Sequence, residues 1–131
     1  MDYGFYATIS GPFDAARQRV IDELKKEGFG ILTEIDIQKA MKEKLDKDVP
    51  AQRILGACNP PLAFKALQAE ANVGLLLPCN VTVRDDGNGQ VIVGFLNPDM
   101  MVELTSNPGM REVAQDASAR LRRVCSALGN A

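Results

Sequence analysis

Two short turns carry most of the chemistry that the residue types of this chain allow. Each turn follows an apolar run and places an asparagine directly after a cysteine, as Cys58-Asn59 and as Cys79-Asn80. The thiolate is the soft metal ligand and the strong nucleophile among protein side chains, and asparagine both donates and accepts hydrogen bonds. We therefore take Cys58, Asn59, Cys79 and Asn80 as the candidate ligand-binding or redox residues.

Cys58 stands immediately before a predicted helix. Asn59 suits the N-cap, and Pro60 and Pro61 suit the first helical positions, where no intrahelical N–H bond is lost. Because a helix N-terminus favours an anion, this placement predicts a lowered pKa for the Cys58 thiol. The alternative is that Cys58 only fills space at a buried strand end, since free cysteine is among the most buried residue types.

The role of Cys79 depends on how its strand pairs with the strand that ends at Cys58. Antiparallel pairing brings both thiols to one end of the sheet, whereas a parallel crossover places them at opposite ends. Two thiolates suit Cu(I) better than zinc, because a structural zinc site takes four ligands and the chain has no histidine. Binding of Cu(I) or Zn(II) by the two thiolates is kept as one alternative.

The absence of histidine also removes the commonest general base and the usual partner of a catalytic serine or cysteine. No catalytic constellation is recognisable, so the chain is not expected to be a conventional enzyme, and no cofactor is predicted. Glu34 and Asp36 form a possible carboxylate pair on one strand, or else Asp36 caps the next helix and Glu34 is a solvated charge. We consider three roles for Met100 and Met101: lining a pocket, forming a subunit contact, or filling the core.

Composition limits the class of protein. The 131 residues fit a single domain, 1–131. Fifteen basic and seventeen acidic residues leave a net charge of -2, which argues against nucleic acid or an anionic membrane as a partner. The start of the chain does not resemble a signal peptide, and no apolar run reaches the ~20 residues of a membrane span, so a cytoplasmic location is expected. Three cysteines exclude a complete disulfide framework.

Hydrophobic periodicity predicts nine elements in the order β-α-β-α-β-α-β-β-α. Strands are expected at 2–10, 29–37, 52–57, 75–84 and 90–96, with helices beginning near Pro12, Ile37, Pro60 and Pro108. The sequence Asp85-Asp86-Gly87-Asn88-Gly89 is typical of a tight hairpin turn, so the sheet is not purely parallel. These features predict a two-layer α+β domain, with about five strands in a mixed or antiparallel sheet and helices mainly on one face.

The segment Ile54-Leu-Gly-Ala-Cys-Asn-Pro-Pro-Leu-Ala-Phe-Lys-Ala-Leu67, with Gly74-Leu-Leu-Leu-Pro-Cys-Asn-Val-Thr-Val83, resembles the domain-of-unknown-function 302 family. The segment 29–37 resembles the second strand of that family. The resemblance implies a small α+β domain, usually a homodimer, with its motif cysteines at Cys58 and Cys79. It also implies an association with sulfur metabolism or redox functions. Some relatives have histidine where this chain has Phe64, so a role that needs an imidazole there is not expected.

Together these features predict a small dimeric domain that binds an anionic or sulfur-containing ligand through Cys58 and Cys79. A different class of function is a structural dimerisation module whose cysteines only pack. The ligand-binding hypothesis predicts that the native cysteines react with thiol reagents, and the structural hypothesis predicts that they do not.

Overall fold

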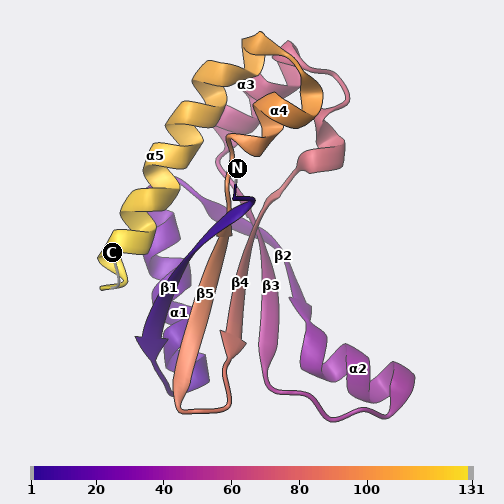
Figure 1. The fold of residues 1–131 in the computed structure, drawn as a ribbon, viewed down its shortest axis with the longest axis vertical. Helices are drawn as coiled ribbons and strands as arrows, with labels where there is room; N and C mark the ends of the chain where they lie inside the picture. The colour runs from indigo at the N-terminus through magenta and orange to yellow at the C-terminus, as the bar shows by residue number, and fades with distance from the viewer. Residues whose placement is uncertain (1, 130–131) are drawn as a thin grey trace.

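The computed structural model describes residues 2–129, which form a five-stranded sheet with helices on one face and at one end (Figure 1). The elements in chain order are β1 (Gly4–Ser10), α1 (Phe13–Lys26), β2 (Gly30–Asp36), α2 (Ile37–Leu45), β3 (Gln52–Cys58), α3 (Pro60–Ala69), the 3₁₀ turn η1 (Val73–Leu76), β4 (Cys79–Asp85), β5 (Gln90–Leu96), α4 (Met100–Thr105), the 3₁₀ turn η2 (Pro108–Met110) and α5 (Arg111–Ala127). The predicted order β-α-β-α-β-α-β-β-α is confirmed, with α4 and the two short turns added to it.

The sheet has the strand order β1-β5-β4-β3-β2, and every neighbouring pair is antiparallel. The predicted α+β class is therefore confirmed, and the sheet is antiparallel throughout rather than mixed. Strands β3 and β4 pair directly although α3 and η1 separate them in sequence. This pairing decides the position of the two cysteine turns, because it brings the last residue of β3 and the first residue of β4 to the same end of the sheet.

Two apolar clusters form the interior. The larger one lies between the sheet and the helices α1 and α5, which cover one face of it. The smaller one joins α3, α4, α5 and both 3₁₀ turns beyond the end of the sheet, at the top of Figure 1. Helix α2 contributes no buried residue and projects from the edge of the sheet beside β2. The end of the sheet that carries the cysteines therefore lies where the two clusters meet.

Two predicted boundaries differ from the structure around this end. The strand expected over 75–84 begins only at Cys79, and Val73–Leu76 is a 3₁₀ turn. Pro78 explains the later start, because proline has no N–H to donate to the strand ladder. Asn107 caps η2 by accepting the Gly109 N–H at 2.8 Å, and α5 follows from Arg111. Over residues 2–129 no helix combines the length and the apolar character that crossing a bilayer requires.

Candidate functional site

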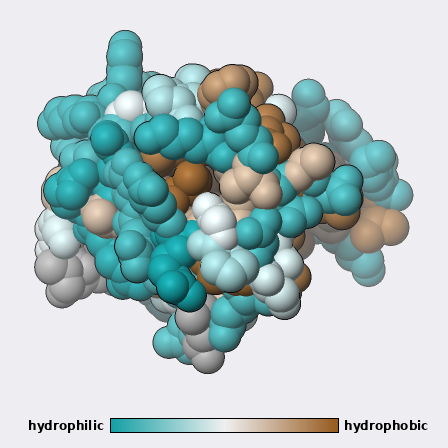
Figure 2. Space-filling view, turned by 90° about the horizontal axis from the view of Figure 1, so that it is seen from above, coloured by the Kyte–Doolittle hydropathy of each residue, from teal (hydrophilic) through white to brown (hydrophobic). Residues whose placement is uncertain are grey.

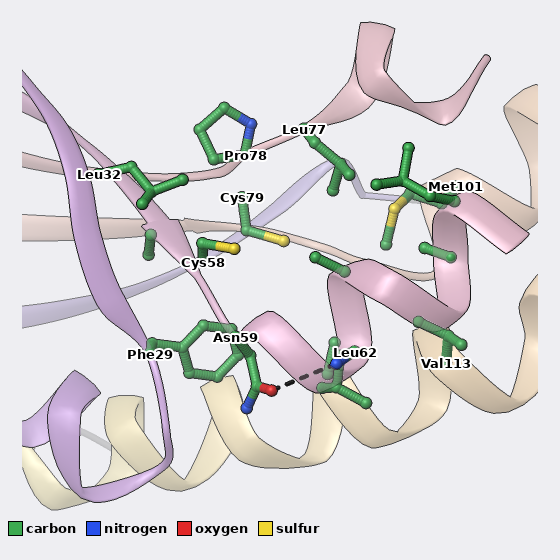
Figure 3. Close-up of a pocket in the computed structure, with 15 residues that line it drawn as sticks. Phe29, Leu32, Cys58, Asn59, Leu62, Leu77, Pro78, Cys79, Met101 and Val113 are labelled. Carbon is green, nitrogen blue, oxygen red and sulfur yellow. Dashed lines mark hydrogen bonds between the residues drawn. The ribbon is translucent and has the colours of Figure 1, made fainter. Parts of the chain in front are cut away.

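The two cysteine turns meet at one end of the sheet. Ala57 of β3 pairs with Cys79 of β4, so Cys58 lies one residue beyond this pair. Figure 3 shows the two thiol groups side by side, with both sulfur atoms directed into the same pocket. Cys79 is only 6% exposed, whereas Cys58 is partly exposed. The open question of topology is thus settled in favour of a two-cysteine arrangement, and both cysteines are free thiols.

A pocket of about 280 Å³ opens beside the thiols, between the end of the sheet, α3, α4 and α5. Its lining comes from both apolar clusters and consists of Phe29, Leu32, Ala57, Cys58, Asn59, Leu62, Ala63, Ala66, Leu67, Leu77, Pro78, Cys79, Met101, Val113 and Ala117. None of these residues carries a charged side chain. The exposed Leu32 and Leu67 stand at its rim, so the pocket is open to solvent.

Local structural features leave this space unfilled. The pairing of β2 with β3 shifts register between Ile31 and Thr33, so Leu32 is an extra residue in its strand. Such a bulge changes the direction of the strand and re-aims its side chains. On α3, Ala63 and Ala66 line the pocket beside Leu62 and Leu67, and their small side chains leave room that a leucine would close. The pocket is thus a consequence of one strand bulge and two small helical residues.

The start of α3 does not activate Cys58 as predicted. Burial raises the pKa of the Cys58 thiol, and the expected lowering is wrong. The reason is that the helix start has no N–H group to offer: Pro60 and Pro61 have none, and the Leu62 N–H is directed at Asn59 Oδ1, 3.4 Å away. The charge of a helix N-terminus resides largely in such unpaired N–H groups. The two prolines and the Asn59 cap therefore leave no free N–H group at this helix start to stabilise a thiolate at Cys58.

The Cys79 thiol is held still more firmly in its neutral form. Burial, with a smaller contribution from the neighbouring Cys58, raises the pKa of Cys79 to about 11. No cationic side chain lines the pocket to offset this effect. At neutral pH the floor of the pocket therefore consists of two uncharged thiols.

Asn59 is buried, and its side chain makes two hydrogen bonds that hold the helix start. Besides capping Leu62, its side-chain amide donates to the Glu27 carbonyl oxygen at 3.2 Å, which connects α3 to the end of α1. The same carbonyl accepts from Arg120 Nη1 on α5 at 3.1 Å. Asn59 thus ties the start of α3 to the end of α1, which Arg120 in turn ties to α5, rather than pointing a free amide at a ligand.

Asn80 lies outside the pocket. It pairs with Gly56 on the sheet and is exposed, because successive residues of a strand face opposite sides and Cys79 occupies the inner one. The structure therefore brings Cys58, Asn59 and Cys79 together and separates Asn80 from them.

Glu34 and Asp36 belong to an ion-pair network at the far end of β2. Glu34 binds the guanidinium groups of Arg17 and Arg53, with Arg53 Nη1 at 2.7 Å, and the hydrogen bonds from Arg17 hold the pKa of Glu34 below its usual value. Asp36 caps α2 by accepting the Lys39 N–H at 2.9 Å, as one of the two interpretations predicted. Neither carboxylate lines the pocket.

Most of the pocket wall was not identified from the sequence. Its aliphatic members lie on ordinary apolar stripes, which carry no sign of whether a residue faces a core or a cavity. Met101 is the exception, since a pocket was among the roles considered for it; it is 3% exposed and points into the pocket (Figure 3). The usable signal was the pair of alanines, Ala63 and Ala66, on a helix that otherwise presents large apolar residues to the interior.

Apolar side chains also gather on the surface around this end of the molecule. Phe64 is 62% exposed and lies one turn before Leu67 at the pocket rim, and Leu75 and Leu104 are 89% and 63% exposed on η1 and α4. Figure 2, which looks onto this end, shows hydrophobic groups between the polar ones and a hollow among them. The approach to the pocket is thus partly apolar.

Metal ligands of the common kinds are sparse. Within residues 2–129 no group of three or more histidine, cysteine, aspartate or glutamate side chains is placed to hold an ion. The Zn(II) alternative therefore lacks the ligands that a closed zinc site needs.

Comparison with known proteins places the chain in a family. The sequence model described as "Domain of unknown function DUF302" matches residues 5–128, nearly the whole chain. The chain belongs to the DUF302 family. The crystal structure of an uncharacterised conserved DUF302 protein from Bacillus stearothermophilus is similar to it, with 28% sequence identity and a TM-score of 0.88, over 96% of this chain and 98% of that chain. No curated protein matches the chain.

Membership of the DUF302 family confirms the resemblance that the two cysteine turns indicated. Family membership indicates the fold, which the solved structure shares, but it indicates no activity. Any function must therefore be argued from the pocket itself.

Proposed function

We propose that this domain binds a small, uncharged, largely apolar molecule in the pocket between the end of the sheet and α3, with Cys58 and Cys79 forming part of its wall. The observation that carries the proposal is the pocket lining, which contains two neutral thiols, one thioether and no charged group. Its volume of about 280 Å³ is close to the lower end of the range of roughly 300–1,000 Å³ usual for small-molecule sites.

An anionic ligand, which was one of the predicted classes, fits this environment poorly. An anion transferred to an apolar pocket needs a cation or several hydrogen-bond donors to replace its hydration. The nearest helix start lacks free N–H groups, and the Asn59 side chain is already bonded to Leu62 and Glu27. A sulfur-containing apolar ligand suits the pocket better, because the thiols and Met101 offer it a polarizable wall.

Two related dyes test this proposal. N-phenyl-1-naphthylamine is uncharged, and 8-anilinonaphthalene-1-sulfonate has the same rings with an added sulfonate. The chain has no tryptophan, so the fluorescence of either dye is easily read against the protein. The uncharged dye is expected to bind with a one-to-one stoichiometry and more tightly than the sulfonate. Equal binding of both dyes, or no binding of the uncharged one, would refute the proposal.

A matched pair of variants locates the binding. Ala63→Phe fills the pocket from α3, where the residue is only partly buried and a larger side chain can be accommodated. Ala119→Phe adds the same ring to the exposed side of α5. The first variant is expected to lose the uncharged dye and the second to retain it, provided that both melt like the native protein. If Ala63→Phe binds as well as the native protein, the dye lies elsewhere.

Thiol titration separates this function from a purely structural role of the cysteines. Under the proposal, the occupied pocket protects Cys58 from a thiol reagent, because the ligand lies against it. If the uncharged dye leaves the reaction rate of Cys58 unchanged, the thiol does not contact the ligand.

The homodimer implied by the resemblance, like the association with sulfur metabolism, stays a prediction. Met101 is no longer a candidate for the dimer interface, because it is buried within its own chain. Sedimentation of the protein tests the dimer directly, and a monomer at micromolar concentration would refute it.

A further inference from the structure

Three sulfur atoms from different parts of the chain face the same pocket. Cys58 comes from the end of β3, Cys79 from the start of β4 and Met101 from α4. Figure 3 shows the two thiol sulfurs adjacent on one wall and the Met101 sulfur on the side that faces them. Thiolate and thioether sulfur are the donors that select Cu(I), which needs fewer ligands than zinc and no histidine. We propose that Cys58, Cys79 and Met101 form a Cu(I) site at the floor of the pocket.

The charge of the pocket favours a monovalent ion. No cationic or anionic side chain lines it, so a bound metal must be neutralised by its own ligands. One Cu(I) ion and one thiolate form an uncharged pair. The ion displaces the proton of Cys58, the more exposed of the two thiols, and this proton leaves to solvent as the sulfur–copper bond forms. Met101 adds as the neutral thioether donor, and the Cys79 sulfur, which keeps its proton, serves only as a weak third contact; no electron is transferred.

Met101 is able to close the site because of its side chain. Methionine has three rotatable bonds and a polarizable sulfur, so it adjusts to a partner more readily than a leucine of similar volume. The residue is buried in the small apolar cluster, so its sulfur is shielded from solvent on the side away from the pocket. The pocket mouth at Leu32 and Leu67 gives the ion a path from solvent.

The chain contains matched controls for each ligand. Met110 is a fully buried methionine of the same cluster that does not line the pocket, and Cys125 is a buried cysteine of the main cluster whose thiol donates to the Tyr6 carbonyl oxygen at 3.4 Å. Exchanging methionine for leucine conserves volume, so Met101→Leu and Met110→Leu are both expected to fold. A difference between the two variants therefore reports the sulfur atom at the pocket and not the packing.

The experiment is a competition between the protein and the Cu(I) chelator bicinchoninate, without oxygen and without added thiols. One Cu(I) ion per chain is expected to bind to the native protein and to Met110→Leu and Cys125→Ser. Met101→Leu is expected to weaken binding by at least about tenfold, the smallest loss usual when even an outer-shell partner of a metal is removed. Cys58→Ser is expected to abolish the site.

Three results would overturn the inference: no Cu(I) bound, equal affinity in Met101→Leu and Met110→Leu, or loss of copper in Cys125→Ser. Binding of N-phenyl-1-naphthylamine to the metal-free variants is measured in parallel. This keeps the two proposals apart, because Met101→Leu retains the apolar pocket. A protein that binds the dye but no copper disproves only the metal site, and one that binds copper but no dye disproves only the proposed small-molecule function.

Discussion

Replacing Asn59 with alanine is expected to destabilise the fold by loosening α3, which carries one wall of the pocket, from the end of α1. The substitution removes the side-chain cap of α3 and the hydrogen bond to the Glu27 carbonyl oxygen at the end of α1. An N-cap contributes about 1 kcal/mol, and a net hydrogen bond also contributes about 1 kcal/mol. The Glu27 oxygen is not left without a partner, because it still accepts from Arg120. We therefore expect a loss of about 2 kcal/mol rather than more.

Thermal and urea denaturation followed by circular dichroism measure this loss. For 131 residues, an unfolding entropy of about 2.1 cal/mol/K per residue converts 2 kcal/mol into a fall in Tm of roughly 7 °C. Asn59→Ser retains a good N-cap acceptor but is too short to reach Glu27, so it is expected to lose about half as much.

Asn72→Ala is the matched control, because Asn72 is exposed and its side chain does not cap the η1 turn that follows it. A surface substitution of this kind usually changes stability by less than about 0.5 kcal/mol. If Asn59→Ala is no more destabilising than Asn72→Ala, Asn59 does not hold the helices together and the reasoning is refuted.

Three further outcomes follow from the structure. The hydrogen bonds from Arg17 lower the pKa of Glu34, so this carboxylate stabilises the folded state above the ordinary glutamate pKa of about 4.3, and the stabilisation is lost as the pH falls through the lower pKa of the folded state. Glu34→Gln should therefore be less stable than the native protein at pH 7, and acid denaturation curves of the two proteins should converge at low pH. Because burial raises the pKa of Cys58, its alkylation rate by iodoacetamide should still rise steeply with pH above about 8.5, and a plateau below pH 8 would contradict this. Gly56→Ala should cost roughly 1–3 kcal/mol in urea denaturation, since a Cβ there would clash with Thr33 Oγ1 and would lie 2.8 Å from Pro78 Cγ. An unchanged midpoint would show that both side chains move aside without loss of stability.

The parts of the fold that were predictable are those that local chemistry determines. The alternation of apolar residues located the strands, and Asp36 and Asn59 marked the helix starts that the structure shows. The hairpin signal at 85–89 located the β4–β5 turn, where the Gly87 and Asn88 N–H groups are bound by the preceding aspartates. Each of these features depends on residues only a few positions apart.

The candidate site was predictable only in part, because it depends on contacts between distant segments. The sequence singled out Cys58 and Cys79, but their meeting required the antiparallel pairing of β3 with β4, which no local pattern reveals. The pKa of Cys58 was predicted in the wrong direction because the helix start was considered without counting its N–H groups. Two prolines and a capping asparagine in the sequence already contained that information.

The pocket itself was missed for a different reason. An apolar residue on a helix stripe is equally consistent with a filled core and with a cavity wall, and only the packing of α3 against α4 and α5 distinguishes the two. The bulge at Leu32 leaves no clear mark in the sequence.

The central claim is that the pocket between the end of the sheet and α3 accepts an uncharged apolar molecule. Methyl-selective NMR of the protein titrated with N-phenyl-1-naphthylamine tests it most directly, because the pocket is lined by methyl groups of known position. We predict that the largest shift changes fall on Leu62, Ala66, Met101 and Val113, with little change on the distant methyl groups of α2. Shift changes confined to α2 or to the open face of the sheet, or none at saturating dye, would contradict the account.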